Sequence, residues 1–220
     1  WDLTRPEWRG KIVLPDPLID EQMLYLLATV VEHSDAMFAT YQQEFGQDLV
    51  LDEDCPNAGY QWIKAMYANE PRWMVGDAEV AGAVGNPKGE AGLLGVCSTE
   101  QLAKVGLGDL ALEPLTAVAP MAGLQWRTYL AIVAHSEHPD AAKLVVRWLM
   151  GDGSGTQGYS AWYEAGFYPA RTDLKDPQGA TPRQNLEPRL WELNPAFMTE
   201  QLQAVRDFVA AQGRGAVSGE

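Results

Sequence analysis

A glycine-rich run, Gly153-Ser154-Gly155-Thr156-Gln157-Gly158, has the spacing of the glycines that hold the phosphates of a dinucleotide. That fingerprint requires a preceding strand, because the turn after the strand brings the backbone against the pyrophosphate. Here the run follows a predicted helix. We therefore interpret residues 151 to 155 as a linker between two helices, and we expect no nucleotide or other cofactor.

An acidic loop from Asp52 to Asn57 begins like a calcium-binding loop. The carboxylates of Asp52 and Asp54 have the alternate spacing that such loops use. Pro56, however, stands at the third ligand position, and no glycine follows it to make the sharp turn. We expect this loop to be solvated surface rather than a metal site.

Histidine and nucleophile patterns give no positive support to a catalytic site. His135 and His138 could bind a metal with Asp140, but Pro139 opens a helix there, so ordinary capping explains the segment. The chain has 3 histidines, and no serine sits in the GxSxG turn of a hydrolase. We expect no enzyme activity. The alternative is a hydrolase or transferase, which would need two carboxylates with separated pKa values in one cleft.

Cysteines and aromatic residues also carry possible chemistry. Cys55 and Cys97 lack metal-ligand spacing, and the sequence allows either one disulfide bond or two free thiols. The chain has 8 Trp and 8 Tyr, and Trp73 and Trp126 fall in predicted loops. Aromatic side chains in loops often line ligand clefts, although a place in the core or at a lobe interface is the commoner role for a single Trp.

Composition disfavours several classes of partner. Lys+Arg 16 against Asp+Glu 30 gives a formal charge of −14, and no cluster of basic residues is present that would bind nucleic acid or an anionic membrane surface. No stretch has the roughly 18 apolar residues of a membrane span. The chain begins at Trp1 and shows no basic and apolar leader, so we expect a processed form.

Predicted strands and helices alternate in the first half of the chain. Short apolar runs at residues 11 to 14 and 91 to 96 are predicted strands, and Pro15 forces the first into a loop. This alternation predicts an α/β fold with parallel strands. Helices are predicted to begin at or just after Asp20, Ser34, Asn57 and Gly76.

The second half continues with two predicted strands, at residues 115 to 120 and 129 to 134, separated by a polar and aromatic loop at 123 to 127. Pro139 then opens a helix. The face of this helix that we expect to be buried consists of Leu144, Val145, Trp148 and Leu149. A last amphipathic helix carries Leu202, Val205, Phe208 and Val209, and residues 213 to 220 are predicted to be frayed.

Several short segments carry a resemblance when they are taken in order. They are Trp1-Asp2-Leu3-Thr4 with Trp8-Arg9-Gly10-Lys11-Ile12 and Pro15-Asp16-Pro17; Val80-Ala81-Gly82-Ala83-Val84 with Gly89-Glu90-Ala91-Gly92-Leu93; Ala131-Ile132-Val133 with His138-Pro139-Asp140-Ala141-Ala142-Lys143 and Trp148-Leu149-Met150; and Gly166-Phe167-Tyr168-Pro169-Ala170-Arg171. Their order resembles the C-terminal two-thirds of an extracellular solute-binding protein of an ABC importer. This is the type II periplasmic-binding fold, which includes iron(III), phosphonate and thiamine binders.

The resemblance implies lobes with a mixed, mostly parallel sheet flanked by helices, and it implies that a first-lobe segment ahead of Trp1 is missing. Residues 1–115 would form the second lobe, residues 116–165 would cross back toward the first lobe, and residues 166–220 would pack on the lobes. The protein would close over a small solute and present it to permease subunits outside the cytoplasmic membrane. A stand-alone interaction module that has lost the pocket is a further alternative.

Ligand contacts in this family come from loops at the carboxyl ends of strands and from the N-termini of helices. Carried over by position, the resemblance implies that the solute is bound by Asp16, Pro17, Asp20, Gly76, Asp77, Cys97, Ser98, Gln125 and Trp126. Iron-binding members have adjacent tyrosines where this chain has Cys97 and Ser98, so ferric iron is disfavoured. The carboxylates would repel an anion, and they favour a cationic or neutral polar solute.

Overall fold

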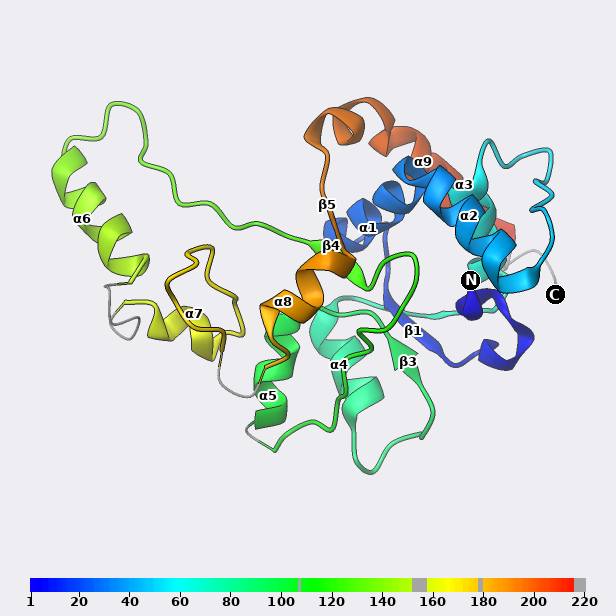
Figure 1. The fold of residues 1–220 in the computed structure, drawn as a ribbon, viewed down its shortest axis with the longest axis horizontal. Helices are drawn as coiled ribbons and strands as arrows, with labels where there is room; N and C mark the ends of the chain where they lie inside the picture. The colour runs from blue at the N-terminus through cyan, green and yellow to red at the C-terminus, as the bar shows by residue number, and fades with distance from the viewer. Residues whose placement is uncertain (107, 152–157, 178–179, 216–220) are drawn as a thin grey trace.

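The computed structural model describes residues 1–106, 108–151, 158–177 and 180–215. Outside these residues lie most of the glycine-rich run at 153 to 158, with its interpretation as a linker, and residues 216 to 220 of the tail that was predicted to be frayed. Residues 213 to 215 of that tail are helical, so the prediction is wrong for them. The described chain is a mixed α/β structure in which helices flank small parallel sheets (Figure 1).

The main sheet has three parallel strands, β1 (Ile12–Pro15), β2 (Arg72–Met74) and β3 (Leu94–Gly95), in the order β2-β1-β3. The central strand β1 is buried along its whole length, as the continuous apolar run predicted. Two expectations were wrong in detail. Trp73 lies in strand β2 rather than in a loop, and only two residues of the predicted strand at 91 to 96 pair with β1.

Three helices that the sequence predicted follow β1; the first and the third share its apolar core, and the second packs on those two helices. These are α1 (Glu21–Glu32), α2 (Ser34–Phe45) and α3 (Ala58–Tyr67). The Asp20 side chain accepts a hydrogen bond from the Met23 N–H, and the Asn57 side chain accepts from the first N–H groups of α3. Gly46, with a φ of 65°, ends α2. The predictions for these three helices are therefore confirmed.

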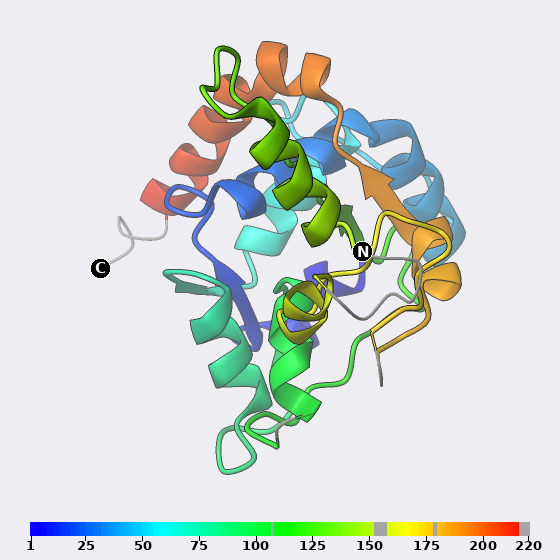
Figure 2. The same cartoon turned by 90° about the vertical axis from the view of Figure 1, so that its left-hand side faces the viewer.

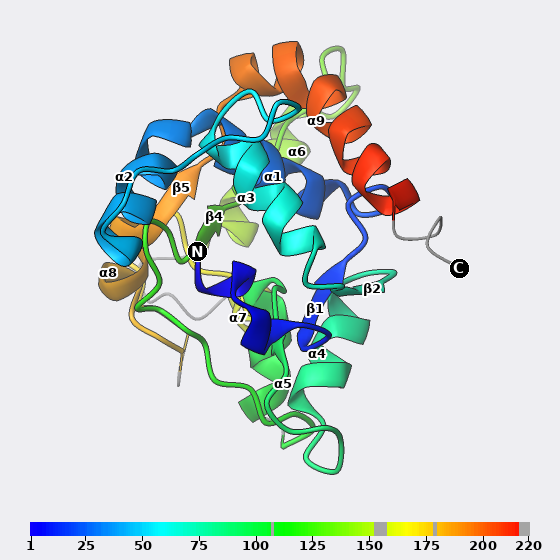
Figure 3. The ribbon, with the colours of Figure 1, turned by 90° about the vertical axis from the view of Figure 1, so that its right-hand side faces the viewer.

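The C-terminal helix α9 (Pro195–Gly215) closes the same core. Met198, Val205 and Val209 of α9 are buried in one cluster with Ile12 and Leu24. Figure 3 shows α9 running beside α1 and α3, so the last helix of the chain packs on the first. Residues at the two ends of the sequence therefore stabilise a single core.

Helix α4 (Asp77–Gly85) covers the other face of the sheet. A Cβ placed on Gly95 would lie 2.7 Å from Val80 Cγ1 and 2.9 Å from Val84 Cγ2, so Gly95 is needed for this close approach. Gly95 pairs with Val13 in the sheet, and paired residues point to the same face. Val13 therefore faces α4, whereas Ile12 and Leu14 face the core with α1, α3 and α9.

A second small sheet pairs β4 (Gly123–Gln125) in parallel with β5 (Leu190–Glu192). The sequence had placed residues 123 to 127 in a loop. The remaining elements are short: η1 (Asp2–Thr4), η2 (Pro6–Trp8), η3 (Thr99–Leu102), α5 (Ala103–Gly106), α6 (Pro139–Leu149), α7 (Ser160–Glu164), α8 (Arg183–Leu186) and η4 (Glu187–Arg189).

The predicted strands at 115 to 120 and 129 to 134 are wrong, because neither segment pairs with a strand in the described part of the chain. Strand-forming residues favour a strand only where a pleated neighbour covers them, and here Tyr129 and Val133 are 79% and 78% exposed. The expected buried face of α6 is also wrong in part. Leu144, Val145 and Trp148 are exposed, and Figure 1 shows α6 at one edge of the molecule, joined to β4 by an extended segment.

Gly59 marks the closest approach of α3 to α1 and gives a test of this packing. A Cβ at this position would lie 2.5 Å from Val31 Cα and 2.6 Å from the Val30 carbonyl oxygen, both of which are backbone atoms that cannot rotate away. We expect Gly59→Ala to lower the free energy of unfolding by about 1–3 kcal/mol in a denaturant titration. The matched control is Gly82→Ala in α4, where a Cβ meets nothing within 4 Å. That variant should be about 0.5–1 kcal/mol more stable than the parent, and equal effects at both positions would contradict the packing described.

Candidate functional site

The carboxyl edge of the three-stranded sheet brings together most of the residues that the sequence singled out. Asp16 and Pro17 follow β1, Gly76 and Asp77 follow β2, and Cys97 and Ser98 follow β3. All three strands are parallel, so their carboxyl ends meet at the same edge. We call this set of residues the carboxyl-edge cluster.

Hydrogen bonds connect the three strand ends directly. The Ser98 N–H donates to Asp77 Oδ2 at 2.7 Å, which ties the end of β3 to the start of α4. The Asp16 N–H donates to the Met74 carbonyl oxygen at 2.8 Å, which ties the end of β1 to the end of β2. The positions of these side chains are therefore fixed by backbone pairing rather than by loop conformation.

Asp16 and Asp20 shape the turn between β1 and α1. Asp16 Oδ1 accepts a hydrogen bond from the Leu18 N–H at 2.9 Å, and Asp20 Oδ1 accepts from the Met23 N–H at 2.8 Å. Among the described contacts, only one oxygen of each carboxylate accepts a hydrogen bond. Both carboxylates are partly exposed, so the other oxygen can accept from a ligand. Asp20 therefore has a structural role as a helix cap as well as its predicted role in binding.

Negative charge gathers at the N-termini of both helices that start at this edge. Glu21 lies in the first turn of α1, and Asp77 and Glu79 lie in the first turn of α4. A helix N-terminus attracts anions when its N–H groups are free. Here side chains of the protein already supply the negative charge, so the edge is suited to a cation or to a hydrogen-bond donor.

Cys97 lies beside this charge and keeps its proton at neutral pH. Burial, and then the negative charge of Asp77, raise the pKa of the Cys97 thiol to about 11. The thiolate is the form that attacks a substrate or binds a metal ion, so a thiol with this pKa suits neither role. Cys55, whose pKa is likewise raised to about 11 mainly by burial, and Cys97 are both free thiols.

An aromatic pair stands over the start of α1. The Trp126 ring lies 5.5 Å from the Tyr25 ring, centroid to centroid, at an interplanar angle of 45°, and Trp126 is 46% exposed. Gln125 is the last residue of β4, opposite Glu192 in β5. The contact between Trp126 and Tyr25 places the end of β4 against α1, about one turn after the Asp20 cap. Gln125 and Trp126 therefore lie beside α1, the helix that starts at the carboxyl edge.

Two tyrosines near the carboxyl-edge cluster were missed by reasoning from the sequence. Tyr25 lies on α1 and touches Trp126, while Tyr67 ends α3 and packs on Trp73 with ring centroids 4.7 Å apart. Burial, and then the negative charge of Asp16, raise the pKa of Tyr67. Tyr67 falls on the apolar spacing of α3, and Tyr25 lies outside that of α1, so the sequence carried no signal that linked either of them to a binding site.

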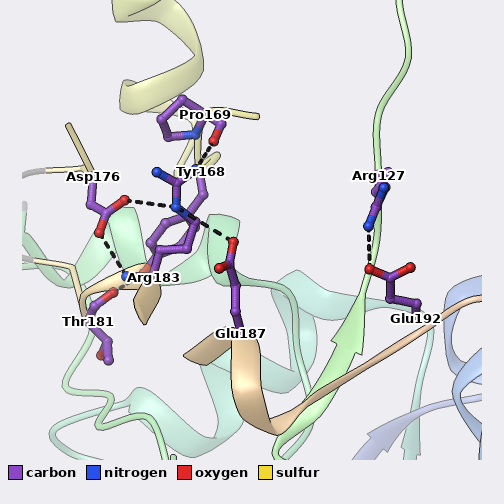
Figure 4. Close-up of polar contacts among 8 residues, drawn as sticks. All are labelled: Arg127, Tyr168, Pro169, Asp176, Thr181, Arg183, Glu187 and Glu192. Carbon is purple, nitrogen blue, oxygen red and sulfur yellow. Dashed lines mark hydrogen bonds and ion pairs between the residues drawn. The ribbon is translucent and has the colours of Figure 1, made fainter. Parts of the chain in front are cut away.

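Ion pairs hold the neighbouring segments in place, as Figure 4 shows. Arg127 pairs with Glu192, which fixes the residue after Trp126 to strand β5. Arg183 lies 3.6 Å from Asp176 and 3.7 Å from Glu187, and it donates to the Pro169 carbonyl oxygen. These contacts give the arginines structural roles and leave Trp126 on a fixed support.

The other candidate sites lack the features of a binding centre. Asp52, Asp54 and Cys55 form a group close enough to hold a metal ion, but Lys64 Nζ lies 2.9 Å from Asp52 Oδ2 and 2.6 Å from Asp54 Oδ1. The lysine supplies the positive charge and lowers the pKa of both carboxyls. His138 is the N-cap residue of α6, where its N–H donates to Ser136 Oγ at 3.3 Å.

A cavity of about 320 Å³ lies elsewhere, between η1, η2 and the ends of α2 and α3. Its wall includes Trp1, Arg5, Tyr41 and Phe45, and none of the predicted site residues lines it. The Arg5 guanidinium lies over the Phe45 ring and pairs with Glu44 and Asp2. Its charge is therefore already balanced by acidic side chains.

Comparison of the chain with protein-family models, with curated proteins and with solved structures finds no match. Among the described residues, no helix is both long enough and apolar enough to cross a membrane.

The raised pKa of Cys97 predicts slow alkylation. In a Cys55→Ala variant, which leaves one cysteine, iodoacetamide at about pH 8 should react with Cys97 roughly 100-fold more slowly than with an ordinary model thiol, because the thiolate fraction falls tenfold for each unit of pKa. Asp77→Asn removes the neighbouring negative charge and should speed the reaction. Mass spectrometry follows the modified fraction over time. A rate at Cys97 equal to that of the model thiol would contradict the burial described.

Proposed function

We propose that this chain is the solute-binding component of an ABC importer, and that it holds a small cationic or neutral polar solute at the carboxyl-edge cluster without a catalytic step. The observation that carries the proposal is the meeting of three strand ends, with Asp16, Asp77 and Ser98, at one edge of a parallel sheet. In open α/β sheets, ligands bind outside the carboxyl ends of the strands.

The strand order gives this edge a specific place for a ligand. The chain passes from β1 to β2 through α1, α2 and α3, and from β2 to β3 through α4 on the opposite face. In such an order the connections diverge at the central strand, and a crevice opens between them at its carboxyl end. Asp16 and Pro17 are the residues at that point, which supports them as the centre of the site.

The charge of the cluster supports the ligand class. Asp16, Asp20 and Asp77 are partly exposed carboxylates at one edge of the sheet. The basic side chain that contacts the turn from Asp16 to Asp20, Arg206, donates to the Leu18 carbonyl oxygen at 3.5 Å. A cationic or hydrogen-bond-donating solute would gain charge-assisted hydrogen bonds there. Trp126, supported by Tyr25, would add an aromatic face, on which a cation is attracted by the ring quadrupole.

The wider assignment rests on the resemblance described from the sequence. In a lobed solute-binding protein of the type II periplasmic-binding fold, residues 1–115 would contribute the second lobe, and permease subunits would be the partners outside the cytoplasmic membrane. Pairing of β4 with β5, and the crossing of residues 111 to 122 between the two sheets, fit a chain that passes from one lobe toward another. The ion pair of Arg127 with Glu192 would fix that passage.

A thermal-shift screen tests the proposal directly. The compounds are metal ions, polyamines, thiamine-like cations, sugars and phosphonates. A ligand at a hundredfold excess over its Kd stabilises the native state by about 2.7 kcal/mol. We expect hits among the cationic or neutral polar compounds, and we expect Asp16→Asn and Asp77→Asn each to weaken binding about tenfold or more, as measured by calorimetry.

Asp35→Asn is the matched control, because Asp35 is an exposed carboxylate in the first turn of α2. Helix α1 carries the chain about 18 Å away from the carboxyl edge before α2 begins, so this substitution changes the net charge equally but lies far from the site. Binding that is insensitive to Asp16→Asn and Asp77→Asn, hits confined to phosphonates, or turnover of a compound would each contradict the proposal.

A further inference from the structure

Helix α6 carries an apolar stripe that its own chain does not cover. Ala141, Leu144, Val145 and Trp148 recur at intervals of three and four residues, which places them on one side of the helix. The last three are 67%, 56% and 59% exposed. The side chains of Ala142, Val146 and Leu149 are less exposed and form the inner side of the helix. The stripe therefore faces away from the body, and Figure 2 shows α6 as the outermost helix in a view from its side of the molecule.

The extended segment before α6 adds further apolar surface. Tyr129 and Val133 are 79% and 78% exposed, and Leu130 and Ile132 are also exposed. We call these four residues, together with Leu144, Val145 and Trp148, the arm face. Of the fifteen large hydrophobic side chains that are exposed in the described part of the chain, seven belong to it. Such a concentration on a short stretch of chain is typical of an interaction surface.

The size of the arm face matches what a specific interface requires. Large side chains such as these bury roughly 150–250 Å² each when aromatic and somewhat less when aliphatic. From the exposed fractions, the seven side chains of the arm face together expose on the order of 800 Å² in one copy, less than half of it on α6, and a standard interface buries about 800 Å² per partner. An interface of ordinary size between two copies would therefore use the segment before α6 as well as the stripe.

Charge favours a second copy in one orientation. In heptad terms, Ala141 and Trp148 take position a, Leu144 takes d and Val145 takes e, so that Asp140 and Arg147 both take position g. In an antiparallel pair of helices, the g positions of the two copies face each other. Asp140 of one copy would then lie opposite Arg147 of the other, twice per pair. Among the described residues, no ion pair involves Arg147, and Asp140, which pairs with Lys143, is 90% exposed.

Overall charge points the same way. Residues 126 to 150 hold three basic and two acidic residues, whereas the whole chain holds Lys+Arg 16 and Asp+Glu 30. Two copies that met through their acidic bodies would repel each other. Two copies that meet through the arm face, where charge is nearly balanced, avoid that repulsion.

We propose that the arm face is an isologous interface between two copies of this chain, in which the two α6 helices pack antiparallel along the stripe. A two-fold axis makes the same patch self-complementary, and the long connection from β4 allows each arm to reach the other copy. Burial of the stripe supplies the affinity, and the two pairs of Asp140 with Arg147 set the orientation. This interface is separate from the carboxyl-edge cluster, so it stands or falls independently of the proposed ligand.

Sedimentation velocity of the full chain over a wide range of concentration tests the interface. We expect a monomer–dimer equilibrium, and we expect Leu144→Glu and Trp148→Glu each to raise the dimer dissociation constant about thirtyfold or more, the effect of losing a central apolar contact. Lys88→Gln is the matched control, because it shifts the net charge by the same one unit at an exposed position after α4, away from the stripe and from the ion pairs of α6. Far-UV circular dichroism of the dilute monomers shows whether each variant keeps its helices.

A charge exchange tests the orientation. Asp140→Arg alone and Arg147→Asp alone should each weaken the dimer about tenfold, and the double variant should recover the parent affinity. The double variant has a positive charge in the first turn of α6 and a negative charge in its last turn, and both interact unfavourably with the helix dipole. A more stable helix therefore cannot explain a recovery of dimer affinity. A monomer at every concentration, a dimer unaffected by Leu144→Glu and Trp148→Glu, or a double variant that stays as weak as the single variants would each overturn the proposal.

Discussion

Burial of β1 on both faces and both edges is the constraint on which the rest of the structure depends. Ile12 and Leu14 point into the core with α1, α3 and α9, and Val13 points toward α4. A strand covered in this way cannot slip by one residue without exposing its apolar side chains. It therefore fixes the register of β2 and β3 beside it, and it fixes the residue at which each strand ends and the chain leaves the sheet. Asp16 takes its position directly from this strand, and Asp77 and Ser98 take theirs from the strands that pair with it.

The same carboxylates serve folding and the electrostatics of the edge. Asp20 caps α1, Asp16 holds the turn before it, and Asp77 accepts the Ser98 N–H. Each contact satisfies a backbone donor that would otherwise be unpaired near a helix end. Each also leaves a negative charge at the carboxyl edge. The cap of α1 and the tie between Asp77 and Ser98 thus determine the sign of the charge that any ligand there would meet.

Local signals in the sequence were sufficient for the part of the fold that depends on local physics. Capping by Asp20 and Asn57, the end of α2 at Gly46 and the buried run of β1 are all decided within a few residues. Strand β2 was missed because Arg72–Met74 has only three residues and no alternation. The grouping of Asp16, Asp77 and Ser98 followed from parallel pairing, whereas Tyr25 and Tyr67 were missed because no signal in the sequence linked either of them to a binding site.

The segments for which the sequence was misleading share one physical property. Residues 115 to 120 and 129 to 134 have the composition of strands, and α6 has the pattern of an amphipathic helix, yet most of their apolar side chains stay exposed. Helix α6 is tied to the chain after its C-terminal end, where Arg171 donates to the Gly151 carbonyl oxygen at 2.6 Å. The stronger apolar side contributes nothing to the described core. An apolar pattern predicts burial only where another surface covers the apolar side chains. For residues 129 to 148 the described chain supplies no such surface, and the proposed interface with a second copy would supply it.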